Sequence, residues 1–102
     1  MGIDLISVGV VCADVMVRPV DAVPAKGTLG LVPKLEMHLG GLAVVTAIVF
    51  SQLGGKSAFV GRLGMDGFGD YLLATLQSNG VNTDGVKQLD SVHSSATVVL
   101  ID

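Results

Sequence analysis

The sequence has few of the residues on which several classes of protein depend. It has one cysteine, Cys12, so no disulfide can form within the chain, and a single free thiol suits a reducing compartment. Its 6 lysines and arginines are scattered and its net charge is −3, so it lacks the clustered basic surface that nucleic acid requires. Its apolar runs fall short of the ~20 residues that span a bilayer, and its N-terminus lacks the basic flank of a signal peptide. We therefore expect a soluble, cytoplasmic protein without a nucleic-acid or membrane partner.

Charged residues are scarce as well, at 15% against about 25% in an average protein. Half of the residues are hydrophobic, which argues against disorder. A chain of 102 residues fits at most one small domain, and such a domain has a limited interior. We therefore expect some apolar residues to face a partner or a missing part of the chain.

The hydrophobic pattern predicts short strands and two helices. Apolar runs that are β-branched or loosely alternating favour strands over residues 4–11, 15–20, 29–39, 57–63, 84–89 (strand or loop) and 95–101. Longer runs, each ended by a glycine pair or Asn-Gly, favour helices over residues 42–53 and 67–78. Asp66 can cap the second helix, and Pro19 suggests that the extended segment over residues 15–20, which contains it, is an edge strand.

This order of elements predicts an α/β fold with a mostly parallel sheet flanked by helices, in a single domain over residues 1–102. The two extended segments between the first strand and the first helix are unusual for that class. A strand that runs to the last residues suggests a chain cut within an element.

Two features could bind a ligand. Gly40-Gly41 opens a helix, where free backbone amides can bind hydroxyls or anions and glycine allows close approach; a tight turn without a ligand is the alternative. Asp14 follows the first strand, at the end of the sheet where open α/β sheets bind ligands; the alternative is a solvated turn aspartate.

The other chemically reactive residues form no motif. Gly54-Gly-Lys-Ser57 resembles the end of a phosphate-binding loop, but Phe50 stands where that loop needs glycine, and the segment joins a helix to a strand. His38 and His93 have no cysteine or carboxylate at metal-ligand spacing, and Cys12 has no basic neighbour to activate it. We expect neither a catalytic residue nor a metal ligand in this chain.

Several segments together resemble the N-terminal signature of the ribokinase-like (PfkB) carbohydrate kinases. They are Val8-Gly-Val-Val-Cys-Ala-Asp14, Pro24-Ala-Lys-Gly27, Gly40-Gly-Leu-Ala-Val-Val-Thr-Ala47 with Leu53-Gly54, Phe59-Val-Gly-Arg-Leu-Gly-Met-Asp-Gly-Phe-Gly-Asp70 and Asn79-Gly-Val-Asn-Thr-Asp84. The similarity covers essentially the whole chain. It implies a ribokinase-like α/β fold, here a partial, mostly parallel sheet flanked by helices, with a small β lid over approximately residues 15–39 and 95–102.

The resemblance also implies sites. Asp14 and the backbone of Gly40 and Gly41 would bind sugar hydroxyls, and Val98 and Leu100 would touch the sugar from the lid. A carboxylate suits a neutral polyol because it only accepts hydrogen bonds. The family's anion hole, catalytic aspartate, magnesium motif and ATP pocket lie in its C-terminal half. ATP and magnesium are therefore expected of the parent protein and not of this chain.

Two positions depart from the family pattern. The family usually has asparagine five residues after the first glycine of the pair, and at this substrate-binding position the chain has Val45, which lacks the donor and acceptor of an amide. Cys12 stands where some ribokinases have asparagine.

The helix over residues 42–53 is apolar nearly all round, with Val45 and Val49 on one side. It is either buried on two sides in the parent or an oligomer interface.

Two functions follow. The first is the sugar-side part of an ATP-dependent carbohydrate kinase, which in the parent transfers phosphate to a sugar or nucleoside hydroxyl, with the isolated chain inactive. The second is a non-catalytic self-associating or engineered assembly module derived from such a kinase. The partners would be a sugar, further copies of the chain, or the missing C-terminal half. The sequence does not specify the sugar.

Overall fold

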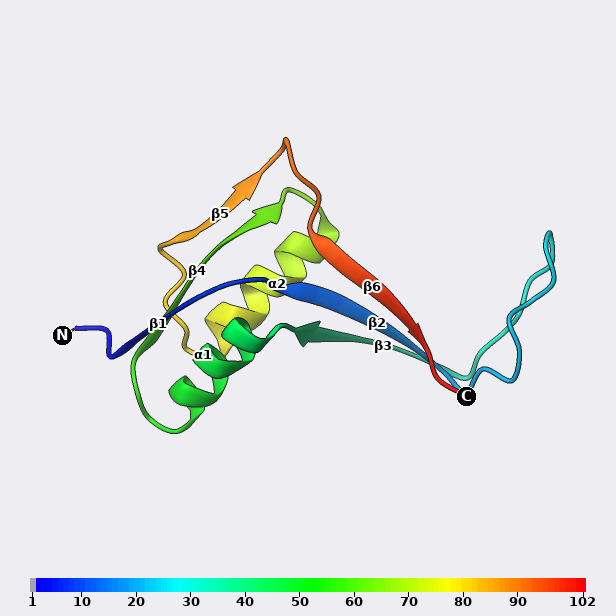
Figure 1. The fold of residues 1–102 in the computed structure, drawn as a ribbon, viewed down its shortest axis with the longest axis horizontal. Coiled ribbons are helices and arrows are strands. Elements are labelled where there is room, and N and C mark those ends of the chain that lie inside the picture. Colours follow the sequence, from blue (N-terminus) through cyan, green and yellow to red (C-terminus); the bar gives the residue numbers. More distant parts are fainter. Residues whose placement is uncertain (1) are drawn as a thin grey trace.

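The computed structural model describes residues 2–102, which form two small sheets and two helices (Figure 1). The strands are β1 (Leu5–Val8), β2 (Cys12–Arg18), β3 (Lys34–Gly40), β4 (Ser57–Gly64), β5 (Val86–Leu89) and β6 (Ser95–Leu100). The helices are α1 (Leu42–Gln52) and α2 (Gly67–Ser78). The radius of gyration, 16.0 Å, exceeds the ~13 Å of a compact chain of this length. Figure 1 shows the reason, since one sheet and the loop between β2 and β3 extend as an arm from the body.

The first sheet is parallel, has the strand order β1-β4-β5, and carries the core. Successive side chains of a strand point to opposite faces, and on one face Phe59 and Leu63 of β4 are buried against both helices. The fully buried helix residues that meet them are Val44, Ala47, Leu72 and Leu76. On the other face Ile6 is 62% and Val8 70% exposed. The predicted α/β class, a mostly parallel sheet with helices, is confirmed, but α1 and α2 cover only one face of the sheet.

The second sheet, here called the lid sheet, consists of β3, β2 and β6. β2 lies in the centre, antiparallel to β3 and parallel to β6. The hydroxyl of Tyr71 on α2 donates a hydrogen bond to the carbonyl oxygen of Met37 on β3 at 3.0 Å. Ala13 of β2 is fully buried in the core beneath α2. The lid sheet is therefore attached to the body along the half of β2 nearest β1.

The helices were predicted more accurately than the strands. Helix 67–78 is confirmed at both ends, and helix 42–53 is confirmed to within one residue. The strand predicted over residues 4–11 is present but shorter, since β1 ends at Val8, and the strand predicted over residues 15–20 begins earlier, at Cys12. The edge-strand prediction for β2 is wrong. Pro19, which cannot donate to a ladder, lies just beyond the end of this central strand.

β3 begins five residues later than predicted, at Lys34. Pro33 immediately precedes it, and its nitrogen has no proton for the ladder with β2. Leu29 and Leu31, whose alternation suggested a strand, are 86% and 89% exposed in the loop. Alternation without a neighbouring strand to pair with therefore produced no strand in this segment.

The carboxylate of Asp66 joins the body to the start of β6. Its Oδ1 accepts a hydrogen bond from the Gly69 backbone N–H at 2.7 Å, which caps α2, and its Oδ2 accepts one from the Ser94 backbone N–H at 3.0 Å. The Ser94 hydroxyl oxygen in turn accepts a hydrogen bond from the Gly64 N–H at 2.9 Å. A Cβ on Gly64 would lie 2.5 Å from Asp66 Oδ2 and 2.6 Å from the Ser94 nitrogen. We call these four residues, Gly64, Asp66, Gly69 and Ser94, the Asp66 turn.

The Asp66 turn makes stability depend on pH. Hydrogen bonds from the backbone N–H groups of Ser94 and Gly69 hold the pKa of Asp66 below its ordinary value. A folded-state pKa that is lowered stabilises the fold above the unfolded-state pKa of about 4, and this contribution is lost as the pH falls through the folded-state pKa. We predict that Asp66→Asn unfolds at a lower temperature at pH 7 and loses less further stability on acidification than the wild type. Thermal unfolding followed by circular dichroism between pH 7 and pH 3 measures both effects.

The matched control is Asp90→Asn, which changes an exposed aspartate in the turn after β5. Its unfolding curves should follow those of the wild type. Equal acid sensitivity of Asp66→Asn and wild type would contradict the role given to the Asp66 carboxylate.

Candidate functional site

Asp14 points to the side of the lid sheet that faces away from the helices. Along β2, alternation places Cys12, Asp14 and Met16 on one face and the buried Ala13 on the other. The helices contact the Ala13 face. The face that carries Asp14 is therefore free of α1 and α2.

The ladder pairs Asp14 with one polar residue on each neighbouring strand. His38 of β3 and Thr97 of β6 are its direct partners. The Thr97 hydroxyl donates a hydrogen bond to Asp14 Oδ1 at 2.6 Å. The Asp14 carboxylate, which is half-buried, is thus part of a polar row across three strands.

Gly40 lies directly against this carboxylate. A Cβ built on Gly40 would come within 2.5 Å of Asp14 Oδ2. No carbon atom fits at that distance from an oxygen, so Gly40 is the residue that leaves room for the carboxylate. The structure therefore brings together Asp14 and Gly40, two of the residues that the sequence indicated.

Gly41 directs the chain from β3 into α1. Its φ of 122° lies in a region that favours glycine, and a Cβ there would overlap the carbonyl oxygen of Val10. Gly41 is the N-cap of α1 and supplies no side-chain hydrogen bond to the first turn. The first N–H groups of the helix therefore remain available to donate hydrogen bonds to a ligand's hydroxyl or anionic oxygen.

The remaining predicted residues lie apart from the carboxylate. Val45 is 43% exposed in the first turns of α1. Val98 and Leu100 of β6 are 69% and 50% exposed, and both point to the face opposite Asp14, because their neighbour Thr97 is the residue paired with it. In this structure the β6 side chain beside Asp14 is that of Thr97.

Sequence reasoning missed Thr97 and set His38 aside. Neither belongs to a local motif, and their proximity to Asp14 follows only from the pairing of β2 with β3 and β6. The one usable signal was the β-branched apolar run over residues 95–101, which predicts a strand but does not specify which of its two faces carries the residue beside Asp14.

Cys12 shares the Asp14 face. Burial, and then the hydrogen bond and negative charge of Asp14, raise the pKa of the Cys12 thiol. A raised pKa keeps the thiol protonated and weakens it as a nucleophile. This agrees with the expectation that no neighbouring group activates Cys12.

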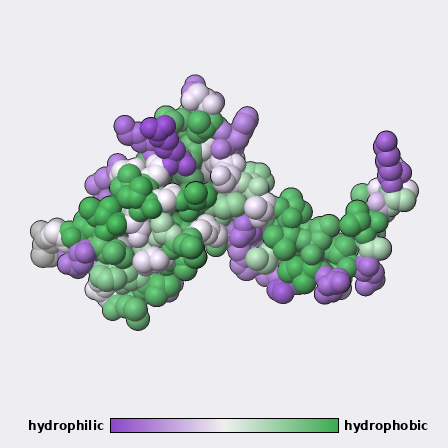
Figure 2. All heavy atoms as spheres, in the orientation of Figure 1, coloured by the Kyte–Doolittle hydropathy of each residue, from purple (hydrophilic) through white to green (hydrophobic). Residues whose placement is uncertain are grey.

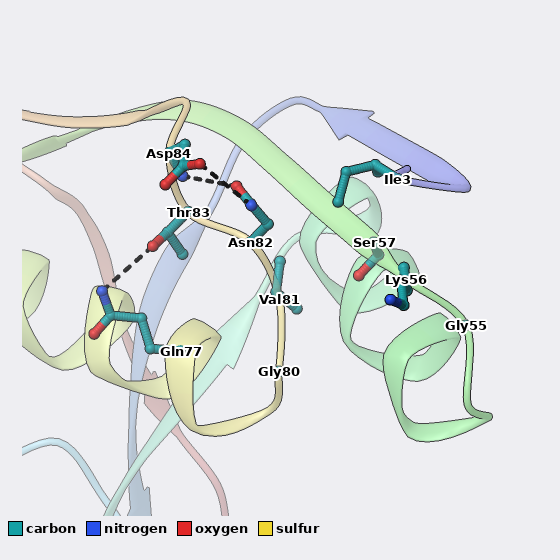
Figure 3. Close-up of a pocket in the computed structure, with 10 residues that line it drawn as sticks. All are labelled: Ile3, Gly55, Lys56, Ser57, Gln77, Gly80, Val81, Asn82, Thr83 and Asp84. Carbon is teal, nitrogen blue, oxygen red and sulfur yellow. Dashed lines mark hydrogen bonds between the residues drawn. The ribbon is translucent and has the colours of Figure 1, made fainter. Parts of the chain in front are cut away.

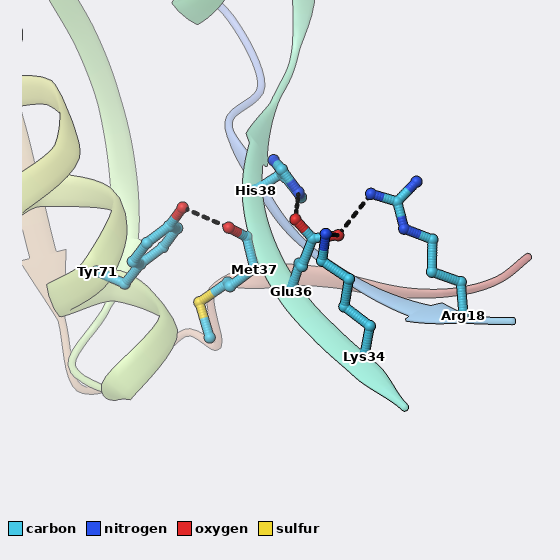
Figure 4. Close-up of polar contacts among 6 residues, drawn as sticks. All are labelled: Arg18, Lys34, Glu36, Met37, His38 and Tyr71. Atoms are coloured by element: carbon cyan, nitrogen blue, oxygen red, sulfur yellow. Dashed lines mark hydrogen bonds and ion pairs between the residues drawn. The ribbon is translucent and has the colours of Figure 1, made fainter. Parts of the chain in front are cut away.

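Further along the same face, Glu36 is surrounded by basic groups (Figure 4). Its carboxylate lies 2.6 Å from Arg18 Nη2, 3.6 Å from Lys34 Nζ and 3.5 Å from His38 Nε2. The hydrogen bond from Arg18 is the main reason that the pKa of Glu36 is lowered. These groups are largely exposed, and such ion pairs add little stability. The His38 ring is directed toward Glu36.

A surface depression of about 520 Å³ lies at the other end of the molecule, near the start of β4 and the end of α2 (Figure 3). Its polar side chains bond one another: Gln77 donates to Thr83 at 3.3 Å, and Asn82 donates to Asp84 at 3.3 Å. It is lined by neither Asp14 nor Gly40. It is separate from the site on the lid sheet.

The described residues do not fit a metal ion. Within residues 2–102, no group of three or more histidine, cysteine, aspartate or glutamate side chains is placed to hold one. In the same part of the chain, no helix is long and apolar enough to cross a bilayer.

Comparisons with known proteins assign the family. The model of the pfkB family carbohydrate kinases matches residues 4–102, so the chain belongs to this family. Fructokinase from Solanum tuberosum is 44% identical over 69 residues, which are 66% of this chain and 22% of that protein. Probable fructokinase-6, chloroplastic, from Arabidopsis thaliana is 39% identical over 80 residues, 76% of this chain and 20% of that protein. The chain spans about a fifth of the length of these relatives, and it resembles their N-terminal part.

Solved structures agree on the fold. Fructokinase from Xylella fastidiosa superimposes with a TM-score of 0.78 at 28% identity, covering 96% of this chain and 28% of that chain. Fructokinase from Halothermothrix orenii gives 0.73 at 30% identity, with 92% and 32% covered. The Xylella enzyme has also been solved with bound ATP, with a TM-score of 0.76 at 26% identity, and 92% and 28% covered. The predicted ribokinase-like fold is confirmed.

The geometry at Gly41 predicts the cost of a side chain there. A residue forced into such a backbone conformation costs roughly 1–3 kcal/mol, and the contact with the Val10 carbonyl adds to it. We predict that Gly41→Ala lowers the free energy of unfolding by at least this amount, as measured by urea denaturation.

Gly67→Ala is the matched control, because Gly67 also begins a helix but a Cβ there would meet nothing within 4 Å. It should leave stability unchanged or slightly raised. If the two variants unfold alike, the turn at Gly41 is not constrained as described.

Proposed function

We propose that this chain is the sugar-binding part of an ATP-dependent carbohydrate kinase of the cytoplasm, with D-fructose as the first sugar to test. The observation that carries the proposal is the Asp14 carboxylate, fixed between Thr97 and Gly40 on a face without helices. The relatives named fructokinase support the choice of sugar.

The chemistry of this face suits a neutral polyol. An ionised carboxylate accepts hydrogen bonds from hydroxyl groups without donating any. The open amides at the start of α1 can donate to sugar oxygens, and Gly40 and Gly41 permit close contact. Recognition would then combine an acceptor on β2 with donors on α1.

The proposal does not include turnover by the isolated chain. Phosphoryl transfer depends on charged groups placed around the transferred phosphate and on a residue that positions the nucleophile. What the family resemblance implies is that these groups, with ATP and magnesium, belong to the C-terminal half of the parent. We derive no catalytic step from the residues of this chain.

Fructose affinity tests the proposal. Asp14→Asn keeps the shape of the side chain and removes its charge, and a hydrogen bond to a charged group contributes about 1.5–3 kcal/mol. We expect fructose to bind about tenfold or more weakly to this variant, as measured by NMR titration. Val45→Asn should act in the opposite direction, because it adds a donor and an acceptor at an exposed position of the first helical turns.

Two controls accompany these variants. Asp21→Asn changes an exposed aspartate of the lid loop, and Val49→Asn places the same amide one helical turn beyond Val45. Both should bind fructose like the wild type. The proposal fails if Asp14→Asn and Asp21→Asn bind fructose equally well.

A second candidate, self-association, rests on α1. Four residues at helical spacing form an apolar stripe on its outer side: Leu42, Val45, Val49 and Leu53, which are 92%, 43%, 44% and 82% exposed. Figure 2 shows hydrophobic side chains gathered over this helix. An apolar stripe of this kind typically packs against another surface, which is either a second copy of the chain or the remainder of a kinase.

Light scattering coupled to size-exclusion chromatography tests whether the stripe on α1 packs against a second copy of the chain or is left for the remainder of a kinase. If the chain self-associates through α1, Val49→Lys should convert it to a monomer, while Ala74→Lys on the exposed side of α2 should not. A monomeric wild type at high concentration rejects this candidate.

Mixing the chain with the C-terminal half of a family member tests the carbohydrate-kinase proposal. ADP release that requires both pieces and a sugar supports it.

A further inference from the structure

The two oxygens of the Asp14 carboxylate have different surroundings. Oδ1 accepts the hydrogen bond from the Thr97 hydroxyl at 2.6 Å. Oδ2 lies against Gly40, at a place where a Cβ would come within 2.5 Å of it. The carboxylate of the central strand is therefore bonded to Thr97 of β6 on one side and lies beside Gly40 of β3 on the other.

We infer that Thr97 is a positioning residue of the sugar site: its hydroxyl engages Oδ1 and so directs Oδ2, the oxygen beside Gly40, toward a sugar hydroxyl. This inference rests on the proposed function of Asp14. A hydroxyl donating to an ionised carboxylate forms a short, charge-assisted hydrogen bond. Threonine is also restricted at χ1 by its branched Cβ, so its hydroxyl has few alternative directions.

Thr97 is the only direct strand partner of Asp14 that donates to it among the described residues. The other partner, His38, lies across the ladder on β3. Figure 4 shows its ring directed toward Glu36, and its Nε2 lies 3.5 Å from the Glu36 carboxylate. The orientation of Asp14 therefore depends on β6 rather than on the charged groups of β3.

The position of Thr97 is set by contacts at both ends of β6. Ser94, three residues before it, is bound to Asp66 and Gly64 in the Asp66 turn. After the strand, the Ile101 N–H donates to the Val17 carbonyl at 3.0 Å, and the Val20 N–H donates to the Ile101 carbonyl at 2.8 Å. Thr97 thus connects the Asp66 turn, which lies in the body, to the carboxylate on the lid sheet.

Three variants test the inference. Thr97→Val keeps the branched shape and the preference for a strand but removes the hydroxyl. Thr97→Ser keeps the hydroxyl and removes the methyl group. Thr75→Val is the control, because the Thr75 hydroxyl bonds only the carbonyl of Tyr71 within α2, at 2.8 Å.

Two readouts are taken on the 102-residue chain. The first is D-fructose affinity by NMR titration, where we expect Thr97→Val to bind about five- to tenfold more weakly, and Thr97→Ser and Thr75→Val to bind within about twofold of the wild type. The second is the χ1 rotamer distribution of Asp14 from NMR scalar couplings without sugar. We expect one rotamer in the wild type, Thr97→Ser and Thr75→Val, and averaging in Thr97→Val.

The two readouts separate this inference from the proposed function. If the wild type binds fructose and Thr97→Val binds it equally well, Thr97 does not position the site. If the wild type fails to bind fructose, the proposed function fails for this chain, and the χ1 rotamers of Asp14 then test the positioning role alone. Rotamer averaging only in Thr97→Val supports that role, while an Asp14 rotamer that is unchanged in Thr97→Val overturns it. Backbone amide spectra of each variant show that the fold is retained.

Discussion

The hydrogen bonds of the Asp66 carboxylate connect the two halves of this molecule. One carboxylate caps α2 and fixes Ser94, so the end of β4, the start of α2 and the start of β6 meet at one point. Gly64 and Gly69 have no side chain because a Cβ at either would collide with this turn. The Gly-Met-Asp-Gly-Phe-Gly segment, which the family resemblance singled out, thus has a structural role. It determines where the last strand of the lid sheet begins.

The high hydrophobic content agrees with an exposed surface that is larger than that of a compact protein of the same mass. The chain exposes 6611 Å², against about 5,400 Å² for a compact protein of 10.4 kDa. The excess lies on the arm formed by the lid sheet and its loop, on the outer stripe of α1, and on the face of the parallel sheet that carries Ile6 and Val8. Ile6 and Val8 lie on the face of the parallel sheet that the helices leave open, and Asp14 lies on the face of the lid sheet opposite the buried Ala13.

Local signals predicted the helices, and long-range pairing limited the prediction of strands and site. Helix 67–78 was predicted at both ends because its cap at Asp66 and its stop at Asn79-Gly80 are local chemistry. Residues 29–33 alternate as a strand does, yet Pro33 and the absence of a partner strand leave them in a loop. Asp14 and Gly40 were indicated by motif spacing. Thr97 was not, because 83 residues separate it from Asp14, and a shift of one residue in the β2–β6 register would put Val98 in its place.

The position of the candidate site explains why contacts outside it should matter for binding. Asp14 lies on β2 just beyond the point where the strand leaves the body, Gly40 and Gly41 lie where β3 returns to it, and Thr97 lies near the start of β6. Each of the three strands is attached to the body close to these residues. β2 is attached by the burial of Ala13, β3 by the hydrogen bond from the Tyr71 hydroxyl to Met37, and β6 by the Asp66 turn. A carboxylate binds a hydroxyl well only in a narrow range of distance and direction. A change in any of these three attachments would alter that geometry without altering Asp14, Gly40 or Gly41.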